Sequence, residues 1–350
     1  MVSTEVKQLL FEGTVIPAHP LALTKDKQLD EQRQRALTNY YIDAGAGGIA
    51  VGVHTTQFEI RDPKFQLFER VLQLAVEQVE QKNLERPFIK IAGLCGPTEQ
   101  ALYEAKTAKE MGYDFGLLSF GGLHHMSEEE LLVHAETVAE VIPIFGFYLQ
   151  IAVGGRELSY DFWRAFAEIP NVHAIKIAPF DRYKTLDVVR AVCHSSRSDD
   201  IALYTGNDDN IVLDLLTTYE VQVGENTVKK QIVGGLLGHW AVWTKKAVEL
   251  LDQIKKVRDQ DNVPADYFTL AQKVSDANAA IFDTAHNFKG CIAGINEVLA
   301  RQGLLKGNWC LLDHEKLSPG QADEIDRVYR EYDDLHDDDF VKAHLHKWLS

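Results

Sequence analysis

The most constraining feature of this sequence is a regular alternation of short apolar runs with longer amphipathic stretches. Eight runs have the length and the branched aliphatic content of buried β-strands, and each is followed by a stretch with helical periodicity. The predicted strands are Thr14–Ala18, Gly47–Val53, Phe88–Leu94, Phe115–Phe120, Ile142–Gln150, Val172–Ala178, Ile201–Thr205 and Gln231–Leu237. The predicted helices are Asp30–Asp43, Gln66–Gln81, Thr98–Met111, Ser127–Val141, Ser159–Ile169, Leu186–His194, Asn210–Tyr219 and Trp240–Lys256. This pattern predicts an α/β fold of the (β/α)8 TIM-barrel type.

The alternative for such a pattern is an open, doubly wound sheet. A nucleotide-binding sheet of that kind carries a glycine-rich phosphate turn after its first strand. Here the first predicted strand is followed by His19-Pro20-Leu21, with no GxGxxG motif. The barrel is therefore the favoured architecture.

The alternation stops near residue 260, and the remaining sequence is typical of helices alone. The predicted helices there are Asp266–Thr284, Lys289–Gln302 and Ser318–His336. No linker rich in Pro, Gly or Ser precedes them. We therefore expect a barrel over residues 1–260 and a C-terminal helical extension over residues 261–350 that packs on the barrel.

Charge and composition restrict the classes of partner. The formal net charge is −16 and the pI is near 5.2, which disfavours nucleic acid and anionic membranes because both bind basic patches. The first residues, Met1–Lys7, lack the apolar core of a signal peptide, so none is expected, and no apolar run approaches the length needed to span a membrane. The four cysteines are widely spaced, without the CxxC pattern of zinc or redox sites. A cytoplasmic protein that acts on a small molecule fits these features.

Lys176 is the residue with the clearest chemical meaning. It lies in the predicted strand Val172–Ala178, where alternation places Val172, Ala174 and Lys176 on one face. An ammonium group among apolar neighbours is costly, so a desolvated lysine has a lowered pKa and becomes an amine nucleophile. The alternative is a lysine at a strand end whose head group reaches water or a carboxylate.

Other polar residues follow the predicted strands, at the end of a barrel where reactive groups gather. An amine (Lys176), a phenol (Tyr148) and two hydroxyls (Thr55 and Thr56) suit a 2-oxo acid. The amine would form a Schiff base with the ketone, the phenol would relay protons, and the hydroxyls would hold the carboxylate. Each residue alone has a structural alternative, since such threonines often cap turns and such tyrosines often lie in the core.

Four stretches resemble the dihydrodipicolinate synthase / N-acetylneuraminate lyase family of class I aldolases. Ala44–Gly52 followed by His54-Thr55-Thr56 resembles the strand-two segment, and Gly206-Asn207-Asp208-Asp209 resembles the strand-seven turn. Tyr148 and Lys176 resemble the tyrosine–lysine pair, and they are separated by 28 residues as in that family. The resemblance covers about Gly13 to Lys256.

The resemblance implies a role for each matching residue. Lys176 would form the imine, and Tyr148 would relay protons in contact with one of the two threonines, Thr55 or Thr56. Thr55 and Thr56 would bind the carboxylate, Gly206 would offer its backbone, and Asp208 or Asp209 would bind hydroxyls of a second substrate portion. The predicted site residues are thus Lys176, Tyr148, Thr55, Thr56, Gly206, Asp208, His54 and His239.

The sequence also departs from the family pattern. His54 and Gln57 replace glycines of the threonine motif, and His239 follows Gly238 at the strand-eight position of a serine or threonine. Ser119-Phe120-Gly121-Gly122 lacks the tyrosine that the synthases share between subunits. The half of the site that forms the imine is therefore expected to be intact, whereas the half that selects the second substrate is not.

These observations lead to one main hypothesis and two alternatives. The main hypothesis is a Schiff-base lyase, aldolase, synthase or dehydratase acting on pyruvate or another 2-oxo acid, without a separate cofactor or metal. It requires the Lys176 nitrogen to be dry and on the same side of the sheet as the Tyr148 phenol. The first alternative is a catalytically silent barrel that binds a sugar acid or 2-oxo acid as a sensor. The second, a metal-dependent hydrolase, rests on His54, His124, His125 and His239, which lack ligand spacing. The resemblance further implies a homo-oligomer, a dimer or a tetramer.

Overall fold

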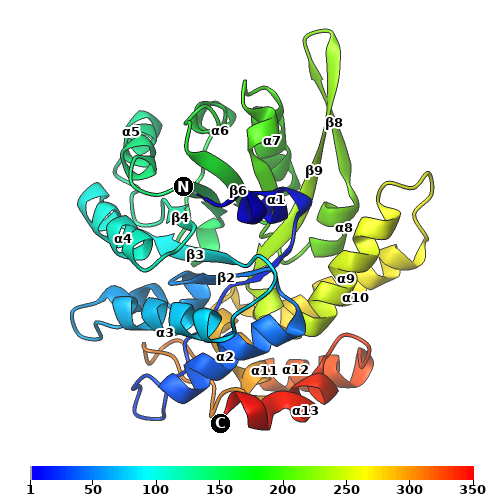
Figure 1. Ribbon diagram of the computed structural model, residues 1–350. Helices are drawn as coiled ribbons and strands as arrows, with labels where there is room; N and C mark the ends of the chain where they lie inside the picture. Colours follow the sequence, from blue (N-terminus) through cyan, green and yellow to red (C-terminus); the bar gives the residue numbers. More distant parts are fainter. Residues whose placement is uncertain (1) are drawn as a thin grey trace.

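The computed structural model describes residues 2–350, and its centre is a parallel β-barrel (Figure 1). The eight barrel strands follow the order β1-β9-β7-β6-β5-β4-β3-β2, and a parallel bridge between Ala18 and Ala50 closes the ring. The strands are β1 (Val15–Pro17), β2 (Gly48–Val51), β3 (Ile89–Leu94), β4 (Phe115–Ser119), β5 (Ile144–Leu149), β6 (Val172–Ala178), β7 (Ala202–Thr205) and β9 (Asn226–Leu237). Each overlaps a predicted strand, so the predicted (β/α)8 architecture is confirmed.

Helices surround the strands, as the alternating sequence predicts. They are α2 (Glu31–Ala44), α3 (Phe68–Gln81), α4 (Thr98–Glu110), α5 (Glu128–Ala139), α6 (Tyr160–Phe166), α7 (Arg182–Cys193), α8 (Ile211–Leu216) and α9 (Thr244–Val257). One cluster of buried side chains fills the space between strands and helices, and a second fills the barrel interior. The interior cluster includes Phe115, Phe145, Phe147 and Tyr204, so the barrel is a packed core rather than a channel.

A one-residue irregularity interrupts the pairing of β5 with β6. Ile144 pairs with Val172, but the next pair is Phe145 with Ala174, so His173 is an extra residue in β6. The predicted alternation is therefore wrong at the start of the strand. Val172 packs in the outer cluster, while Ala174 and Ala178 lie in the interior cluster. From His173 onward every inward residue of β6 is displaced by one position relative to β5.

Two elements of the barrel region were not expected. Helix α1 (Thr4–Glu12) packs against β3 and β9, with Leu10 in the interior cluster, and the Tyr204 hydroxyl donates to Leu10 O at 2.8 Å. Strand β8 (Thr218–Val223) pairs antiparallel with β9 and forms the hairpin that projects beyond the helices in Figure 1. The predicted helix Asn210–Tyr219 was too long, because the β-branched residues from Thr217 onward continue as this strand.

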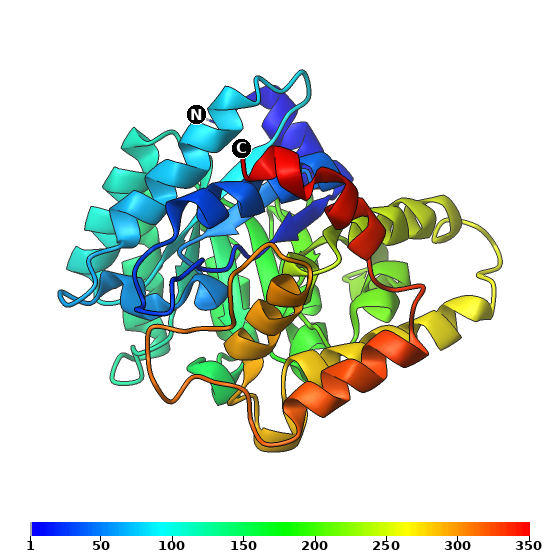
Figure 2. The same cartoon turned by 90° about the horizontal axis from the view of Figure 1, so that it is seen from below.

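The C-terminal residues form four helices rather than the predicted three. They are α10 (Asp266–Ile281), α11 (Cys291–Arg301), α12 (Gln321–Glu331) and α13 (Asp338–Trp348). Helix α10 packs against α8 and α12, and α13 packs against α2. In Figure 2 the orange helix α11 lies in front of the barrel strands. The division of the chain into a barrel over residues 1–260 and a helical extension over residues 261–350 stays a prediction. No helix among residues 2–350 is both long and apolar enough to cross a membrane.

A buried ion pair ties the ends of β2 and β3 to helix α4. Arg61 Nε lies 2.8 Å from Glu104 Oε1, and Arg61 Nη2 lies 3.1 Å from Glu104 Oε2. The same Nη2 donates to Gly52 O at 3.0 Å and to Gly93 O at 2.8 Å. Both side chains are largely buried, at 10% and 2% exposure. Removal of either partner would therefore leave an uncompensated charge inside the protein.

We expect Glu104→Ala to lower the free energy of unfolding by about 3–5 kcal/mol, because it leaves the Arg61 guanidinium buried and unpaired. Urea denaturation would measure the change. Glu220→Ala is the matched control, since it breaks the exposed Lys229–Glu220 pair of the hairpin, 3.0 Å long. Loss of an exposed pair changes stability by at most about 1 kcal/mol. Equal effects of the two substitutions would contradict the assigned role of the buried pair.

Candidate active site

Lys176 lies in a small pocket at the C-terminal end of the barrel strands. The pocket has a volume of about 40 Å³, and its wall includes Phe147, Gly206, Asp208 and Cys291. That space holds on the order of three water-sized groups. Lys176 is only 7% exposed, as the sequence predicted for a desolvated amine.

The lysine side chain is positioned by apolar and aromatic contacts. Its Nζ lies 4.3 Å from the centre of the Phe147 ring. Its aliphatic part passes over Gly206, where a Cβ atom would come within 2.5 Å of Lys176 Cε. Burial lowers the pKa of Lys176 below that of an ordinary lysine, and the nearby Asp208 carboxylate opposes this shift. A neutral amine is thus accessible close to neutral pH.

Asp208 is the carboxyl group of this pocket. It is 5% exposed, and its Oδ1 accepts a hydrogen bond from the backbone N–H of His239 at 2.7 Å. Burial raises the pKa of Asp208, and the His239 hydrogen bond and Lys176 oppose the rise. His54 also lines the pocket; burial and the Lys176 charge lower its pKa to about 4, so its imidazole is neutral at physiological pH.

Tyr148 lies on the other side of the sheet from Lys176, so its predicted place as the phenol beside the lysine was wrong. Of the two conditions of the main hypothesis, the dry lysine nitrogen is met, whereas the phenol on the same side of the sheet is not. A proton relay for Lys176 therefore has to be another group. Its ring packs 5.2 Å from that of Trp163 in the outer cluster. Its hydroxyl donates to Leu158 O at 3.3 Å and accepts from Leu158 N–H at 3.4 Å. The irregularity in β6 explains the error, because it pairs Lys176 with Phe147 and Tyr148 with Ile177. Without the extra residue, the 28-residue separation would have placed Tyr148 opposite Lys176.

The two threonines brace the loop after β2 rather than meeting a phenol. The Thr56 hydroxyl accepts from Gly52 N–H at 3.0 Å and donates to His19 O at 2.6 Å. The Thr55 hydroxyl donates to Ala18 O at 2.8 Å. Of the two, only Thr55 lines the Lys176 pocket. The predicted contact of Tyr148 with one of the two threonines is therefore absent, and both threonine hydroxyls are occupied by backbone groups.

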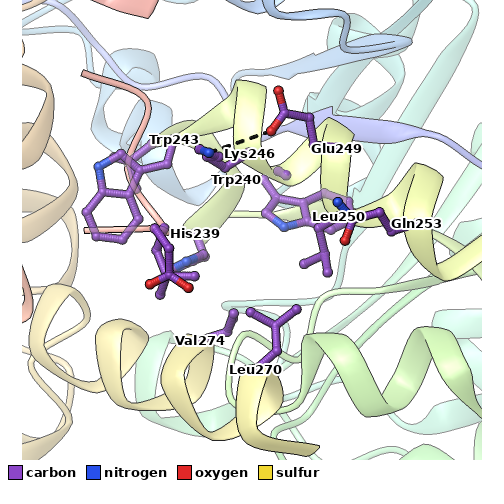
Figure 3. A pocket seen from close by; sticks show the side chains of 13 residues that line it. His239, Trp240, Trp243, Lys246, Glu249, Leu250, Gln253, Leu270 and Val274 are labelled. Atoms are coloured by element: carbon purple, nitrogen blue, oxygen red, sulfur yellow. Dashed lines mark ion pairs between the residues drawn. The ribbon is translucent and has the colours of Figure 1, made fainter. Parts of the chain in front are cut away.

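The His239 ring occupies a different pocket from Lys176, so its predicted place at the substrate was wrong. Figure 3 shows it beside Trp243, with Leu270 and Val274 of α10 opposite. This second pocket has a volume of about 240 Å³. The contribution of His239 to the Lys176 pocket is its backbone N–H, which holds Asp208. The neighbouring Gly238 lines the pocket directly.

Several pocket residues were not among the predicted site residues. Phe147 and Gln150 are provided by β5 and the loop after it, and Phe282 and Cys291 by the C-terminal helical region. The strand alternation could have indicated Phe147 only if the irregularity in β6 had been known. The sequence carries no signal that places Cys291 over the barrel. Within residues 2–350 no group of three His, Cys, Asp or Glu side chains is arranged to hold a metal ion.

Comparison with known sequences gives a family match over most of the barrel. The model of the dihydrodipicolinate synthetase family matches residues 12–237. The 4-hydroxy-tetrahydrodipicolinate synthase of Syntrophobacter fumaroxidans is 30% identical over 202 residues, which are 57% of this chain and 64% of that enzyme. The corresponding synthase of Geotalea uraniireducens is 24% identical over 200 residues, with the same coverage. The chain thus matches less than two thirds of the length of these relatives.

Solved structures with the same fold cover nearly the whole chain. N-acetylneuraminate lyase from Fusobacterium nucleatum, complexed with pyruvate, superposes with a TM-score of 0.70 at 16% identity and covers 93% of this chain and 99% of the lyase. YagE, a prophage protein of E. coli K12 in complex with pyruvate, superposes with a TM-score of 0.74 at 16% identity, covering 92% and 98%. At these identities the likeness establishes the barrel fold.

We expect Lys176 to react with small amine-modifying reagents at lower pH than an ordinary lysine does, because burial disfavours its charged form. Reductive methylation with formaldehyde over a pH series, followed by peptide mass spectrometry, would measure this. The exposed Lys25 in the same samples provides the comparison. A Lys176 profile that coincides with that of Lys25 would contradict the lowered pKa.

We expect Tyr148→Phe to leave the rate of Lys176 methylation within about twofold, since the hydrogen bonds of the hydroxyl within residues 2–350 go to Leu158 and not to the pocket of Lys176. A general acid–base group contributes typically ~10²–10⁴-fold, so a phenol that served the lysine would show a far larger loss. The same mass-spectrometric assay applies. A tenfold fall in Lys176 reactivity, with unchanged reactivity of Lys25, would show that the phenol reaches the amine.

Proposed function

The chain belongs to the dihydrodipicolinate synthetase family, and on that premise we propose that it is a Schiff-base lyase or hydro-lyase acting on pyruvate or another small 2-oxo acid. The observation that carries the proposal is the buried Lys176 amine in a pocket at the C-terminal end of the barrel. A desolvated amine with a lowered pKa attacks a ketone without needing a separate base to deprotonate it. The resulting iminium would act as the electron sink for the adjacent carbon–carbon or carbon–oxygen bond.

The size and lining of the pocket support a small 2-oxo acid at the imine position. A volume of about 40 Å³ suits a three-carbon unit better than a sugar acid. The His54 ring and the Gln150 amide are further polar groups on the wall and would orient the carboxylate. Support also comes from the pyruvate complexes of the F. nucleatum lyase and YagE, whose folds this chain shares.

Larger cavities adjoin the Lys176 pocket and would hold the rest of a longer substrate. One, of about 610 Å³, shares His54 and Val153 with the pocket and is also lined by Lys289 and Glu315. Another, of about 430 Å³, shares Gln150 and Phe180. These cavities include side chains from the C-terminal helical region. The second substrate portion would therefore be selected by residues outside the stretch that matches the family model.

A second candidate is a catalytically silent barrel that binds a 2-oxo acid as a sensor. One specific observation favours it: the phenol expected as the proton relay faces away from Lys176. A sensor of this kind would bind pyruvate without breaking bonds in it. Assembly into a dimer or tetramer stays a prediction, which sedimentation velocity would test.

We expect borohydride reduction in the presence of pyruvate to attach one reduced three-carbon unit, and peptide mapping to locate it at Lys176. Lys176→Arg is the matched variant, because it keeps a positive charge on a long side chain but cannot form the imine. Intact mass spectrometry measures the adduct. An adduct that persists in Lys176→Arg, or no adduct with pyruvate or with longer 2-oxo acids, would overturn the proposed function. An adduct without any turnover of a panel of 2-oxo acids would favour the sensor.

A further inference from the structure

We propose that Asp208 is the proton relay for the Lys176 imine, in the place that the phenol of Tyr148 does not occupy. This inference rests on the proposed function. Both groups line the same small pocket, one from β6 and the other from the turn after β7. A substrate attached to Lys176 would therefore occupy the pocket that Asp208 also lines.

The position of the carboxylate suits a relay better than a permanent ion pair. No carboxylate in the described part of the chain lies within the 4.0 Å ion-pair distance of Lys176 Nζ. Asp208 is nevertheless near enough for the two charges to influence each other. A substrate attached to Lys176 would thus meet a carboxylate that is not tied to the amine. Asp208 Oδ1 is held by the His239 N–H, whereas Oδ2 has no hydrogen-bond partner among residues 2–350.

A network of buried side chains holds the turn that carries Asp208. Asn207 Oδ1 accepts from Phe180 N–H at 3.0 Å, and Asn207 Nδ2 donates to Asp214 Oδ2 at 2.9 Å. The Thr205 hydroxyl donates to the same Asp214 oxygen at 2.6 Å. Asn207 and Asp214 are almost fully buried, at 0% and 1% exposure. The carboxylate is thus presented from a rigid support, as a proton-transfer group requires.

The other polar groups of the pocket are less suited to accept and return a proton. Burial raises the pKa of the Cys291 thiol well above its ordinary value, with Asp208 adding to the shift. The lowered pKa of about 4 keeps His54 neutral and makes it a weak base. The Thr55 hydroxyl proton is already donated to Ala18 O. Asp208, whose burial raises its pKa toward neutrality, has the proton affinity that general acid–base catalysis needs.

Asp208 gives up one proton and regains one during the formation of an enamine from pyruvate. The neutral Lys176 amine adds to the ketone carbon, and transfer of its proton to the oxygen gives a carbinolamine. The Asp208 carboxylic acid donates its proton to the departing hydroxyl, so that water leaves and the iminium forms beside a carboxylate. The carboxylate then removes a proton from the methyl group, giving the enamine and restoring the carboxylic acid. The sum is amine plus pyruvate to enamine plus water.

Exchange of the pyruvate methyl protons for deuterium in D2O, followed by NMR, reports the proton-removal step directly. We expect Asp208→Asn to slow this exchange at least ~100-fold, within the range typical of a lost acid–base group. The asparagine keeps an oxygen that can accept from His239 N–H, so the turn is retained. Asp62→Asn is the control: Asp62 also accepts one backbone N–H, from Lys64 at 2.7 Å, but is exposed and lies outside the pocket. The Asp62→Asn substitution should change the rate of deuterium exchange into pyruvate less than twofold.

The pH dependence separates a relay from a structural role. Proton removal needs the carboxylate, so exchange by the wild type should fall as the pH drops through the raised pKa of Asp208, above the ordinary value of about 3.9. Lys176, His54, Cys291 and Asp209 are the titratable groups facing or adjoining this carboxylate. Protonation of the Lys176 amine lowers exchange in both proteins, so the acidic limb of Asp208→Asn should reflect one titrating group instead of two, and the residual exchange should remain lysine-dependent.

Two results would overturn the inference, and they differ from failure of the proposed function. One is a Lys176–pyruvate adduct together with exchange by Asp208→Asn within twofold of the wild type. The other is slow exchange by Asp208→Asn with an unchanged pH profile. If Asp208→Asn does not fold, Asp208→Ala with added formate tests the same point, because formate should restore exchange only when a carboxylate is the missing group. Absence of any wild-type adduct would overturn the imine itself, and the relay with it.

Discussion

The pairing of β5 with β6 is the interaction on which the candidate site depends. One extra residue, His173, displaces the inward residues of β6 by one position against β5. Side chains alternate across a strand, so a shift of one residue exchanges the inner and outer faces for every later pair. The shift places the Phe147 ring under the Lys176 ammonium and turns Tyr148 toward Trp163. A single backbone irregularity thus decides which β5 side chain lies beside the lysine.

Because Phe147 and not Tyr148 lies beside Lys176, the pocket has an apolar ring where a phenol was expected, and fewer of its groups can transfer protons. Lys176 and Asp208 are both buried, and burial moves the pKa values of an amine and a carboxyl group in opposite directions, toward each other. The two groups then differ little in proton affinity, which suits the repeated transfers of imine chemistry. The same arrangement explains why Gly206 is needed, since any side chain there would collide with the lysine stem.

Both the barrel and the C-terminal helical region contribute residues to the wall of the Lys176 pocket. The threonine hydroxyls after β2 fasten that loop to the carbonyl groups at the end of β1. From the other side, Phe282 and Cys291 complete the wall above Lys176. The barrel therefore provides the buried amine, and residues of the C-terminal helical region form part of the wall around it. This division agrees with a family match that ends at residue 237, before the C-terminal helical region.

Local patterns in the sequence determined the barrel, most of its strands and the dry environment of Lys176. Periodicity and apolar composition act over a few residues, so they can be recognised without knowledge of distant contacts. The sequence could not show that His173 is an extra residue, because a bulge is defined by how one strand pairs with its neighbour, here β6 with β5. For this reason the sequence alone placed Tyr148 at the lysine. His239 was misplaced for another reason, because the direction of a side chain in the turn after β9 is set by packing against α10 and Trp243. Only the tertiary structure decided that Asp208 faces the amine and that residues near 282–291 cover it, since these contacts join segments with no local signal for one another.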